Sequence, residues 1–200
     1  MKQAIIDIGS NSIRLTLYEI ENSSFKILFR EKIMAGLAGY VENGALSAEG
    51  MECACAGLLT FRRILQTLHI EHISVFATAS LRNISNTQQA LGIIRAATGY
   101  SVEVLSGESE ALLGYAGAMQ ELHLRSGAFL DIGGASTEIV TFDEGKPVDL
   151  ASFPIGSLSL YRRCVKRILP GQGSLKRLQQ EIDKTIQPGH AALAERPLLV

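Results

Sequence analysis

Two stretches of the chain end an apolar run in an aspartate that a turn of small residues follows. The first is IIDIGSNSIRL at residues 5–15 and the second is FLDIGGASTEIV at residues 129–140. Backbone N–H groups in such turns can cradle phosphate oxygens, while a carboxylate such as Asp7 or Asp131 can hold Mg²⁺ or orient water. A phosphate with its metal needs both parts at once. For either stretch alone, an aspartate that only accepts hydrogen bonds from turn amides is the alternative.

One offset, the 124 positions that separate residue 7 from residue 131, superposes the two stretches. The identical residues that it aligns are Asp7 with Asp131, Ile8 with Ile132, Gly9 with Gly133 and Ser12 with Ser136. A single offset over all these matches favours a duplication, whose two copies would face each other across a cleft. The phosphate-binding candidates are then Gly9, Ser10, Asn11 and Ser12 in the first copy and Gly133, Gly134, Ala135 and Ser136 in the second.

Between the two copies lies ATASLRN, residues 77–83, which follows an apolar strand pattern. We expect Thr78, Ser80 and Arg82 to lie in a loop at the end of that strand. The planar guanidinium of Arg82 could bind phosphate, with the hydroxyls adding contacts. A solvated surface arginine is the equally weighted alternative.

Acidic residues supply candidates for handling water. SGESEALLGY, residues 106–115, predicts a helix start with Glu108 and Glu110 in its first turn, where the helix dipole by itself favours acids. If this helix end points into the cleft, either glutamate could act as a general base. Glu138, seven residues after Asp131 in a predicted strand, is a weaker candidate for positioning metal or water.

The elements that must position these residues begin with three predicted strands at residues 3–8, 12–20 and 25–33. A helix at about 47–68 follows, with Ser47 as its N-cap. The segments ISVFATAS, TQQALGIIRAATG, SVEVLS and ESEALLGYAGAMQEL then alternate strand and helix. This β-β-β-α-β-α-β-α order predicts an α/β fold, a mixed sheet flanked by helices.

A second unit begins near residue 127 with three predicted strands, followed by helices at about 157–168 and 174–187. RPLLV at residues 196–200 has the pattern of a strand start. We therefore predict domains at 1–124 and 125–200, the second truncated relative to a longer protein. An apolar strand at a free edge would favour a homodimer or aggregation.

Composition limits the remaining classes. The formal charge is −1, so we expect no nucleic-acid partner. No apolar run reaches about 18 residues and no leader pattern is present, which predicts a cytoplasmic protein without membrane insertion. The cysteines and histidines lack metal-type spacing. The basic segment YRRCVKRI, residues 161–168, predicts a helix with a solvated face, guidance of a long polyanion being the lesser alternative.

Five motifs together resemble one family. AIIDIGSNSIRL, ATASLRNISN, VEVLSGESEALLGY, FLDIGGASTEIV and FPIGSLSLY occur in the order and at about the spacing of the Ppx/GppA family of exopolyphosphatases and guanosine pentaphosphate phosphatases. The resemblance covers nearly the whole chain. It implies the actin-like ATPase superfamily fold, in which two duplicated ribonuclease H-like domains with mixed sheets enclose a cleft.

The resemblance also implies an activity: Mg²⁺-dependent hydrolysis of the terminal phosphoanhydride of inorganic polyphosphate, or of the 5′ γ-phosphate of pppGpp. By motif, Glu110 falls on the general base, and Asp131 and Glu138 fall on acids that handle metal and water. Arg82 falls on a phosphate-binding arginine, and the two small-residue turns fall on the phosphate loops. Asp7 remains a further metal candidate.

Three departures from the family pattern bear on the expected activity, the first two through its rate and substrate. Where the family has S-G-x-E-E-A-R, this chain has Ser109 and Leu112 in place of a glutamate and an arginine, and Ala135 replaces a loop glycine. A glycine-rich turn expected after PLLV would follow residue 200, which bears on whether these 200 residues are active by themselves. A second hypothesis therefore stands beside the hydrolase: a sensor module that binds a phosphorylated nucleotide in the same cleft and turns it over poorly. A sugar or acetate kinase has no supporting motif.

Overall fold

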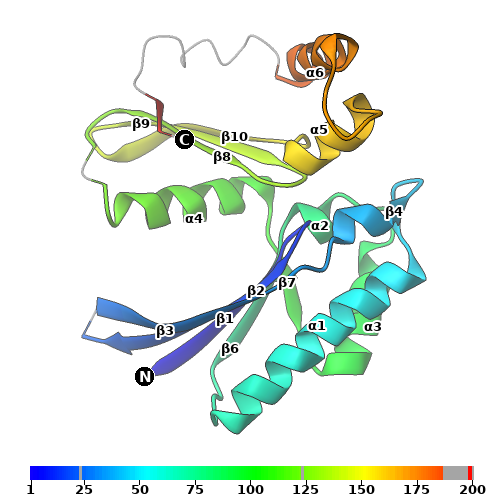
Figure 1. Cartoon of the computed structure of the whole chain (residues 1–200). Helices are drawn as coiled ribbons and strands as arrows, with labels where there is room; N and C mark the ends of the chain where they lie inside the picture. The colour runs from blue at the N-terminus through cyan, green and yellow to red at the C-terminus, as the bar shows by residue number, and fades with distance from the viewer. Residues whose placement is uncertain (23, 123, 187–197, 200) are drawn as a thin grey trace. The chain divides into compact units, whose positions relative to one another are not determined.

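The computed structural model describes residues 1–22, 24–122, 124–186 and 198–199, which form two compact units, Met1–Leu105 and Ser106–Val200 (Figure 1). The elements of the first unit are β1 (Lys2–Ile8), β2 (Ile13–Glu21), β3 (Ser24–Ile33), η1 (Leu37–Tyr40), β4 (Val41–Glu42), β5 (Ala45–Leu46), α1 (Ala48–Thr67), β6 (Ile73–Ala77), α2 (Ala79–Arg82), α3 (Thr87–Thr98) and β7 (Val102–Val104). Those of the second are α4 (Gly107–Met119), β8 (Gly127–Ile132), β9 (Thr137–Asp143), β10 (Lys146–Phe153), α5 (Ser157–Cys164), α6 (Gln172–Thr185) and β11 (Leu198–Leu199).

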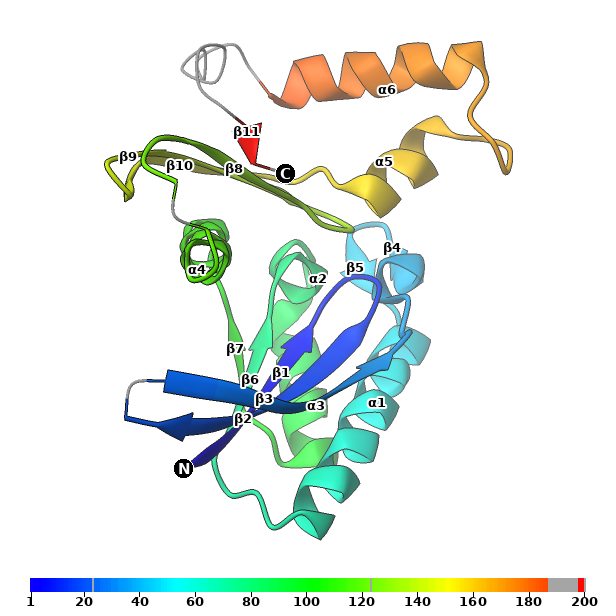
Figure 2. The same cartoon turned by 60° about the vertical axis from the view of Figure 1, so that its left-hand side comes forward.

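A five-stranded mixed sheet in the order β3-β2-β1-β6-β7 forms the first unit. β1 pairs antiparallel with β2 and parallel with β6. The alternation of β1 buries Ala4, Ile6 and Ile8 completely, and these residues join the core that α1 and α3 cover. Figure 2 shows α1 and α3 side by side on one face of this sheet. The predicted mixed sheet with flanking helices is confirmed.

Residues at the helix ends determine where α1 begins and where α3 ends. Ser47 caps α1, its side chain accepting a hydrogen bond from the N–H of Gly50, as expected from sequence. Gly99 ends α3 in the left-handed conformation at φ 73°. α1 can approach the sheet closely because residue 57 is glycine: a Cβ there would lie 2.9 Å from Ile13 Cδ1.

The second unit repeats the strand order of the first. Its sheet is β10-β9-β8-β11, in which β8 pairs antiparallel with β9 and parallel with β11. The register repeats as well, since Ala128 pairs with Leu198 just as Ala4, 124 positions earlier, pairs with Ile73. The strand predicted for RPLLV is present at its described residues. This shared topology and register support the duplication.

Helix α4 packs on the β8–β10 sheet, where Ala111 and Tyr115 join Val140 and Phe142 in a buried cluster. Burial raises the pKa of the Tyr115 hydroxyl. In chain order α4 ends the first repeat, although it packs with the second sheet. The domain boundary predicted after residue 124 and the predicted homodimer both stay predictions.

Two sequence expectations were wrong in detail. Residues 79–82 form the short helix α2 rather than a loop, because a single helical turn is too short to produce a readable apolar period. The basic helix expected over 157–168 ends at Cys164, and the next residue, Val165, is extended at φ −109° and ψ 116°. A β-branched side chain suits that extended backbone.

Candidate active site

Two turns with the same backbone follow β1 and β8. In the first, the N–H of Gly9 donates to the carbonyl of Ser12 at 3.0 Å, and in the second the N–H of Gly133 donates to Ser136 at 3.0 Å. A Cβ at residue 9 would lie 3.0 Å from the Ser12 carbonyl oxygen, and one at residue 133 would lie 3.3 Å from that of Ser136. Glycine is therefore favoured at the same point of both turns, for the same steric reason.

The helical segment after the third strand holds the first turn by its carbonyls. The Ser10 carbonyl accepts from the N–H of Ala38 at 2.9 Å, and the Asn11 carbonyl accepts from the N–H of Gly36 at 2.8 Å. Both donors lie at the start of η1. The side chains of Ser10 and Ser12 are buried, which further fixes the turn.

The start of α5 holds the second turn in the corresponding way. The Gly133 carbonyl accepts from the N–H of Ser157 at 2.9 Å, and the Gly134 carbonyl accepts from the N–H of Leu158 at 2.9 Å. Gly156 makes this approach possible, because a Cβ at residue 156 would lie 2.6 Å from the Gly133 carbonyl oxygen and 2.7 Å from the Ala135 nitrogen. Sequence reasoning missed Gly156.

All the described peptide bonds are trans, so the C=O and the N–H of each peptide point in opposite directions. The carbonyls of these turns point toward η1 or α5, and the N–H groups of the same peptides therefore point away from it. The N–H groups concerned belong to Asn11, Ser12, Gly134 and Ala135. None of these four donates to an acceptor among the described residues. Each unit thus presents a pair of adjacent backbone donors, an arrangement that suits an anion.

The side chains beside the two turns differ in charge. Asp7 pairs directly with Arg14 across β1 and β2, whereas Asp131 pairs directly with Glu138 across β8 and β9. Directly opposite residues of antiparallel strands project on the same face of the sheet. Sequence reasoning missed Arg14, although the 124-residue offset aligns it with Glu138.

Arg14 is exposed, and its Nε donates to Ser12 Oγ at 3.3 Å, so the guanidinium is close to the first turn. Glu138 in contrast is only 2% exposed, and its Oε1 accepts a hydrogen bond from Ser152 Oγ at 2.8 Å. Asp131 is exposed. The first turn therefore has a carboxylate and a cation beside it, and the second has two carboxylates.

Arg82 is neither a loop residue nor a freely solvated one. It is half-buried, and its Nη1 donates to the carbonyl of Leu105 at 3.1 Å. The neighbouring Ser80 donates from Oγ to the carbonyl of Ile8, the residue before the first turn. Since β6 runs parallel to β1, with Ala77 opposite Ile8, the start of α2 lies at the same sheet edge as the first turn.

Helix α4 carries Glu110 over the second sheet. Ser106 caps this helix by accepting from the N–H of Ser109 at 3.0 Å, and the two hydroxyls lie 3.0 Å apart. Ser109 thus takes part in the cap at the position where the family pattern has a glutamate. With serine at residue 109, the N-terminus of α4 is still capped by side-chain hydrogen bonds.

Two glycines of α4 allow the helix to approach β10 and β8 closely. A Cβ at residue 107 would overlap Ser152, and one at residue 114 would lie 3.2 Å from Phe129 Cζ and 3.8 Å from Asp131 Oδ2. Glu110 lies one turn from each glycine and is half-buried. The second unit therefore gathers Glu110, Asp131 and Glu138 on the α4 side of its sheet.

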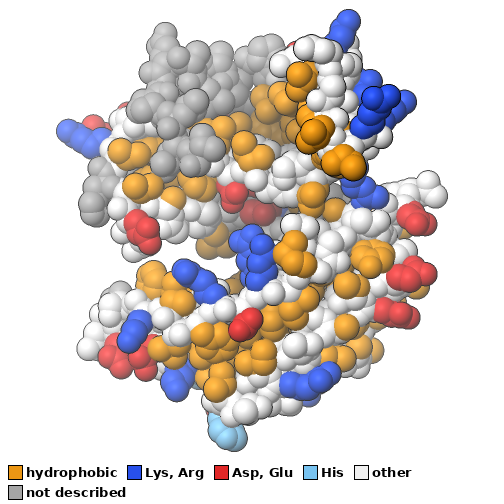
Figure 3. Space-filling view, in the orientation of Figure 1, with side chains coloured by type: hydrophobic (Ala, Val, Ile, Leu, Met, Phe, Trp, Pro, Cys, Tyr) orange, Lys and Arg blue, Asp and Glu red, His pale blue; other side chains and the backbone are white. Residues whose placement is uncertain are grey.

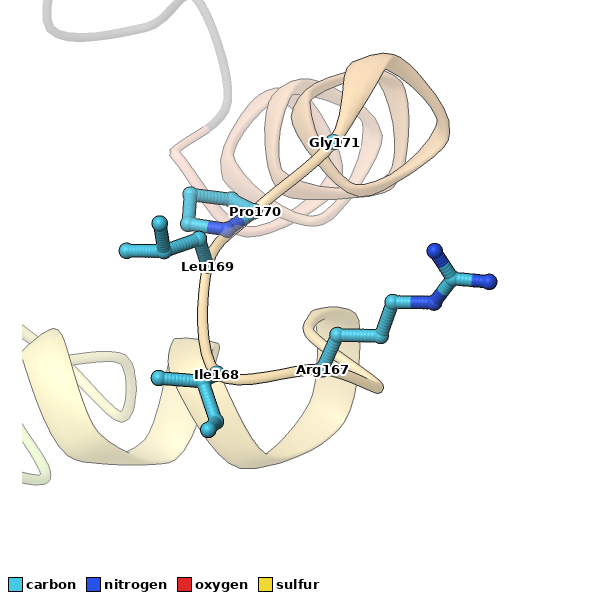
Figure 4. Close-up of a pocket in the computed structure, with 5 residues that line it drawn as sticks. All are labelled: Arg167, Ile168, Leu169, Pro170 and Gly171. Carbon is cyan, nitrogen blue, oxygen red and sulfur yellow. The ribbon is translucent and has the colours of Figure 1, made fainter.

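A separate surface hollow lies in the α5–α6 connection, lined by Arg167, Ile168, Leu169, Pro170 and Gly171. Figure 4 shows the Arg167 guanidinium directed away from Ile168 and Leu169. Hydrophobic and basic side chains share the surface over α5 and α6 (Figure 3). None of the predicted site residues lines this hollow.

Comparisons with known proteins give a consistent result. The model of the Ppx/GppA phosphatase family matches residues 16–196. An exopolyphosphatase crystal structure from Cytophaga hutchinsonii is 27% identical over 99% of this chain and 65% of its own, with a TM-score of 0.90. The Ppx/GppA family member from Aquifex aeolicus is 28% identical over 92% of this chain and 61% of its own, with a TM-score of 0.72.

This chain therefore spans less than two thirds of the length of these two structures. The similarity confirms the actin-like ATPase fold expected from the sequence motifs. Among the described residues, no helix is long and apolar enough to cross a membrane.

Proposed function

The chain belongs to the Ppx/GppA phosphatase family, and on that premise we propose that it is part of an enzyme that hydrolyses phosphoanhydride bonds. The reaction releases terminal orthophosphate from inorganic polyphosphate or the 5′ phosphate from pppGpp. The observation that carries the proposal is the repeated turn, which presents a pair of outward N–H donors in each unit, with Asp131 and Glu138 beside the second. The N–H donors suit phosphate oxygens, and the two carboxylates suit the metal ion and the water that phosphate hydrolysis requires.

In this proposal the two turns and the arginines bind the phosphate chain. The N–H groups of Asn11 and Ser12 contact one set of phosphate oxygens and those of Gly134 and Ala135 contact another. Arg14 and Arg82 add charge-assisted contacts from the first unit. Because phosphoryl transfer depends on positioning and charge stabilisation, fixed backbone donors contribute to the rate as well as to binding.

Glu110 acts as the general base. A water oxygen attacks the terminal phosphorus, Glu110 takes the proton of that water, and the bond from phosphorus to the bridging oxygen breaks. The electron pair of that bond leaves with the shortened phosphate chain. The half-buried position of Glu110 on α4, over the strands that bear Asp131, supports this assignment.

The donor set suits Mg²⁺. This ion takes one or two carboxylates and fills its other positions with water and substrate phosphate. Asp131 and Glu138 offer two carboxylates from directly opposite positions, and no group of three or more His, Cys, Asp or Glu side chains in the described ranges is arranged to hold a metal by itself. Bound Mg²⁺ would supply charge neutralisation at the phosphate. Asp7 is the third candidate ligand proposed from sequence.

The test is phosphate release by the full-length protein with polyphosphate, pppGpp and ATP, each with and without Mg²⁺. Glu110→Gln should lower kcat by about 10²- to 10⁴-fold. The matched control is Glu108→Gln, because Glu108 lies in the same first turn of α4 but is exposed. Equal turnover in the two variants would remove Glu110 from the mechanism, and no phosphate release from any substrate would overturn the hydrolase itself.

A sensor module is the second candidate. Leu112 stands where the family pattern has an arginine and is 40% exposed, so one positive charge of that pattern is missing while the backbone donors are intact. Tight Mg²⁺-dependent binding of pppGpp without phosphate release from any of the three substrates would favour it.

A further inference from the structure

Ser152 contacts both Glu138 and the start of α4, the helix that carries Glu110. It lies in β10 directly opposite Glu138 in β9, and its Oγ donates to Glu138 Oε1 at 2.8 Å. Glu138 is 2% exposed. A carboxylate this deeply buried depends on hydrogen-bond donors in the protein to replace water. Because the strand register sets the position of Ser152, the bond also sets where Oε1 lies.

The same serine supports the start of α4. A Cβ at residue 107 would overlap Ser152 Cβ and lie 2.5 Å from its Oγ, so Gly107 rests directly on the serine. Neither residue 107 nor residue 152 can take a larger side chain without a shift of its neighbour. Glu110 follows Gly107 by three residues, one helical turn along α4. Any shift of Ser152 therefore moves the base of the helix that carries Glu110.

We infer that Ser152 is a positioning residue. Its hydroxyl orients the Glu138 carboxylate, and its contact with Gly107 sets the distance between the start of α4 and the sheet. The inference rests on the proposed function, in which Glu138 handles the metal and Glu110 the water. Ser152 itself touches neither substrate nor metal in this account. Residues that orient metal ligands typically contribute about 10- to 100-fold to metal affinity or activity.

Three variants of the full-length protein test the inference. Ser152→Ala removes the hydroxyl, whereas Ser152→Thr keeps it and adds a methyl group beside Gly107. The matched control is Ser126→Ala, since Ser126 also donates to a carboxylate of the same unit, Asp143, at 2.6 Å, but this hydrogen bond is exposed to solvent. Melting temperatures of all three establish that they fold.

The first readout is a crystal structure of Ser152→Ala, which is independent of activity. We expect the Glu138 carboxylate to turn away from its wild-type position or to recruit a water at the site of the lost hydroxyl. An unchanged Glu138 rotamer without a replacement water overturns the inference. This readout stands even if the wild-type protein releases no phosphate, an outcome that would instead refute the proposed function.

The second readout is function. For Ser152→Ala we expect Mn²⁺ affinity, followed by electron paramagnetic resonance as a stand-in for Mg²⁺, and kcat to fall about 10-fold or more, with KM within about 3-fold of wild type. Ser152→Thr should keep the Mn²⁺ affinity but lose part of kcat, because its methyl group displaces α4. If wild type is active and Ser152→Ala behaves like Ser126→Ala in both measurements, the inference fails while the proposed function stands.

Discussion

The turn after β1 and the turn after β8 share a backbone but differ in the charge beside it. Both close with a 3.0 Å bond from a glycine N–H to a serine carbonyl, and both are held by the helical segment after the third strand. Yet Asp7 faces Arg14, whereas Asp131 faces Glu138. The backbone geometry is thus the same in the two units, while the charges beside it differ. In the proposed function both turns bind phosphate, and the second also has the two carboxylates that would handle the metal and the water.

Within the comparison of the two turns, the largest expected effect comes from replacing the equivalent aspartates, Asp7 and Asp131, one at a time. Asp131→Asn should lower kcat by about 10²- to 10³-fold, since it weakens the site for the ion that stabilises the transition state. Asp7→Asn should lower kcat by only about 10-fold. Steady-state phosphate release with polyphosphate measures both, and equal losses in the two variants would contradict the proposed division of roles.

Removing the positive charge of the first turn should affect binding instead. We expect Arg14→Gln to raise KM about 10-fold with kcat nearly unchanged, because a charge-assisted hydrogen bond to phosphate contributes equally to the ground state and the transition state. Steady-state kinetics separates the two constants. A loss confined to kcat would place Arg14 in the chemical step and remove the contrast with Glu138.

A smaller effect concerns the support beneath the second turn. Gly156→Ala should destabilise the protein by about 1 to 3 kcal/mol, because the new methyl group overlaps the backbone of residues 133–135. The apparent melting temperature measures this. Gly117→Ala is the matched control: it adds a methyl to α4, where a Cβ would meet no atom within 4 Å, and should be neutral or stabilising. Equal melting temperatures for Gly156→Ala and Gly117→Ala would show that the second turn shifts to accommodate the added methyl group at little cost.

Local sequence signals predicted much of the fold. The capping serine of α1, the terminal glycine of α3 and the apolar strand that contains Asp7 each depend on a few neighbouring residues, and each was confirmed. The 4-residue helix α2 was missed because it is too short to show a period. The end of α5 at Cys164 was missed because charged residues continue past it without a glycine or proline.

The candidate site was predicted less completely. Asp131, Glu138 and the second turn lie close in sequence, so motif spacing found them. Ser152 and Gly156 act through β10 and its connection to α5, and their contacts depend on a strand register that spacing does not reveal. Arg14 could have been found, since the offset that aligned the aspartates also aligns it with Glu138.

The most direct test of the two-turn account is a crystal structure of the full-length protein with inorganic phosphate and Mg²⁺. We expect an anion that accepts hydrogen bonds from the N–H groups of Asn11 and Ser12 in the first turn and of Gly134 and Ala135 in the second, with the metal at Asp131 and Glu138. Turns on opposite faces of the molecule, or an anion bound away from both, would contradict it.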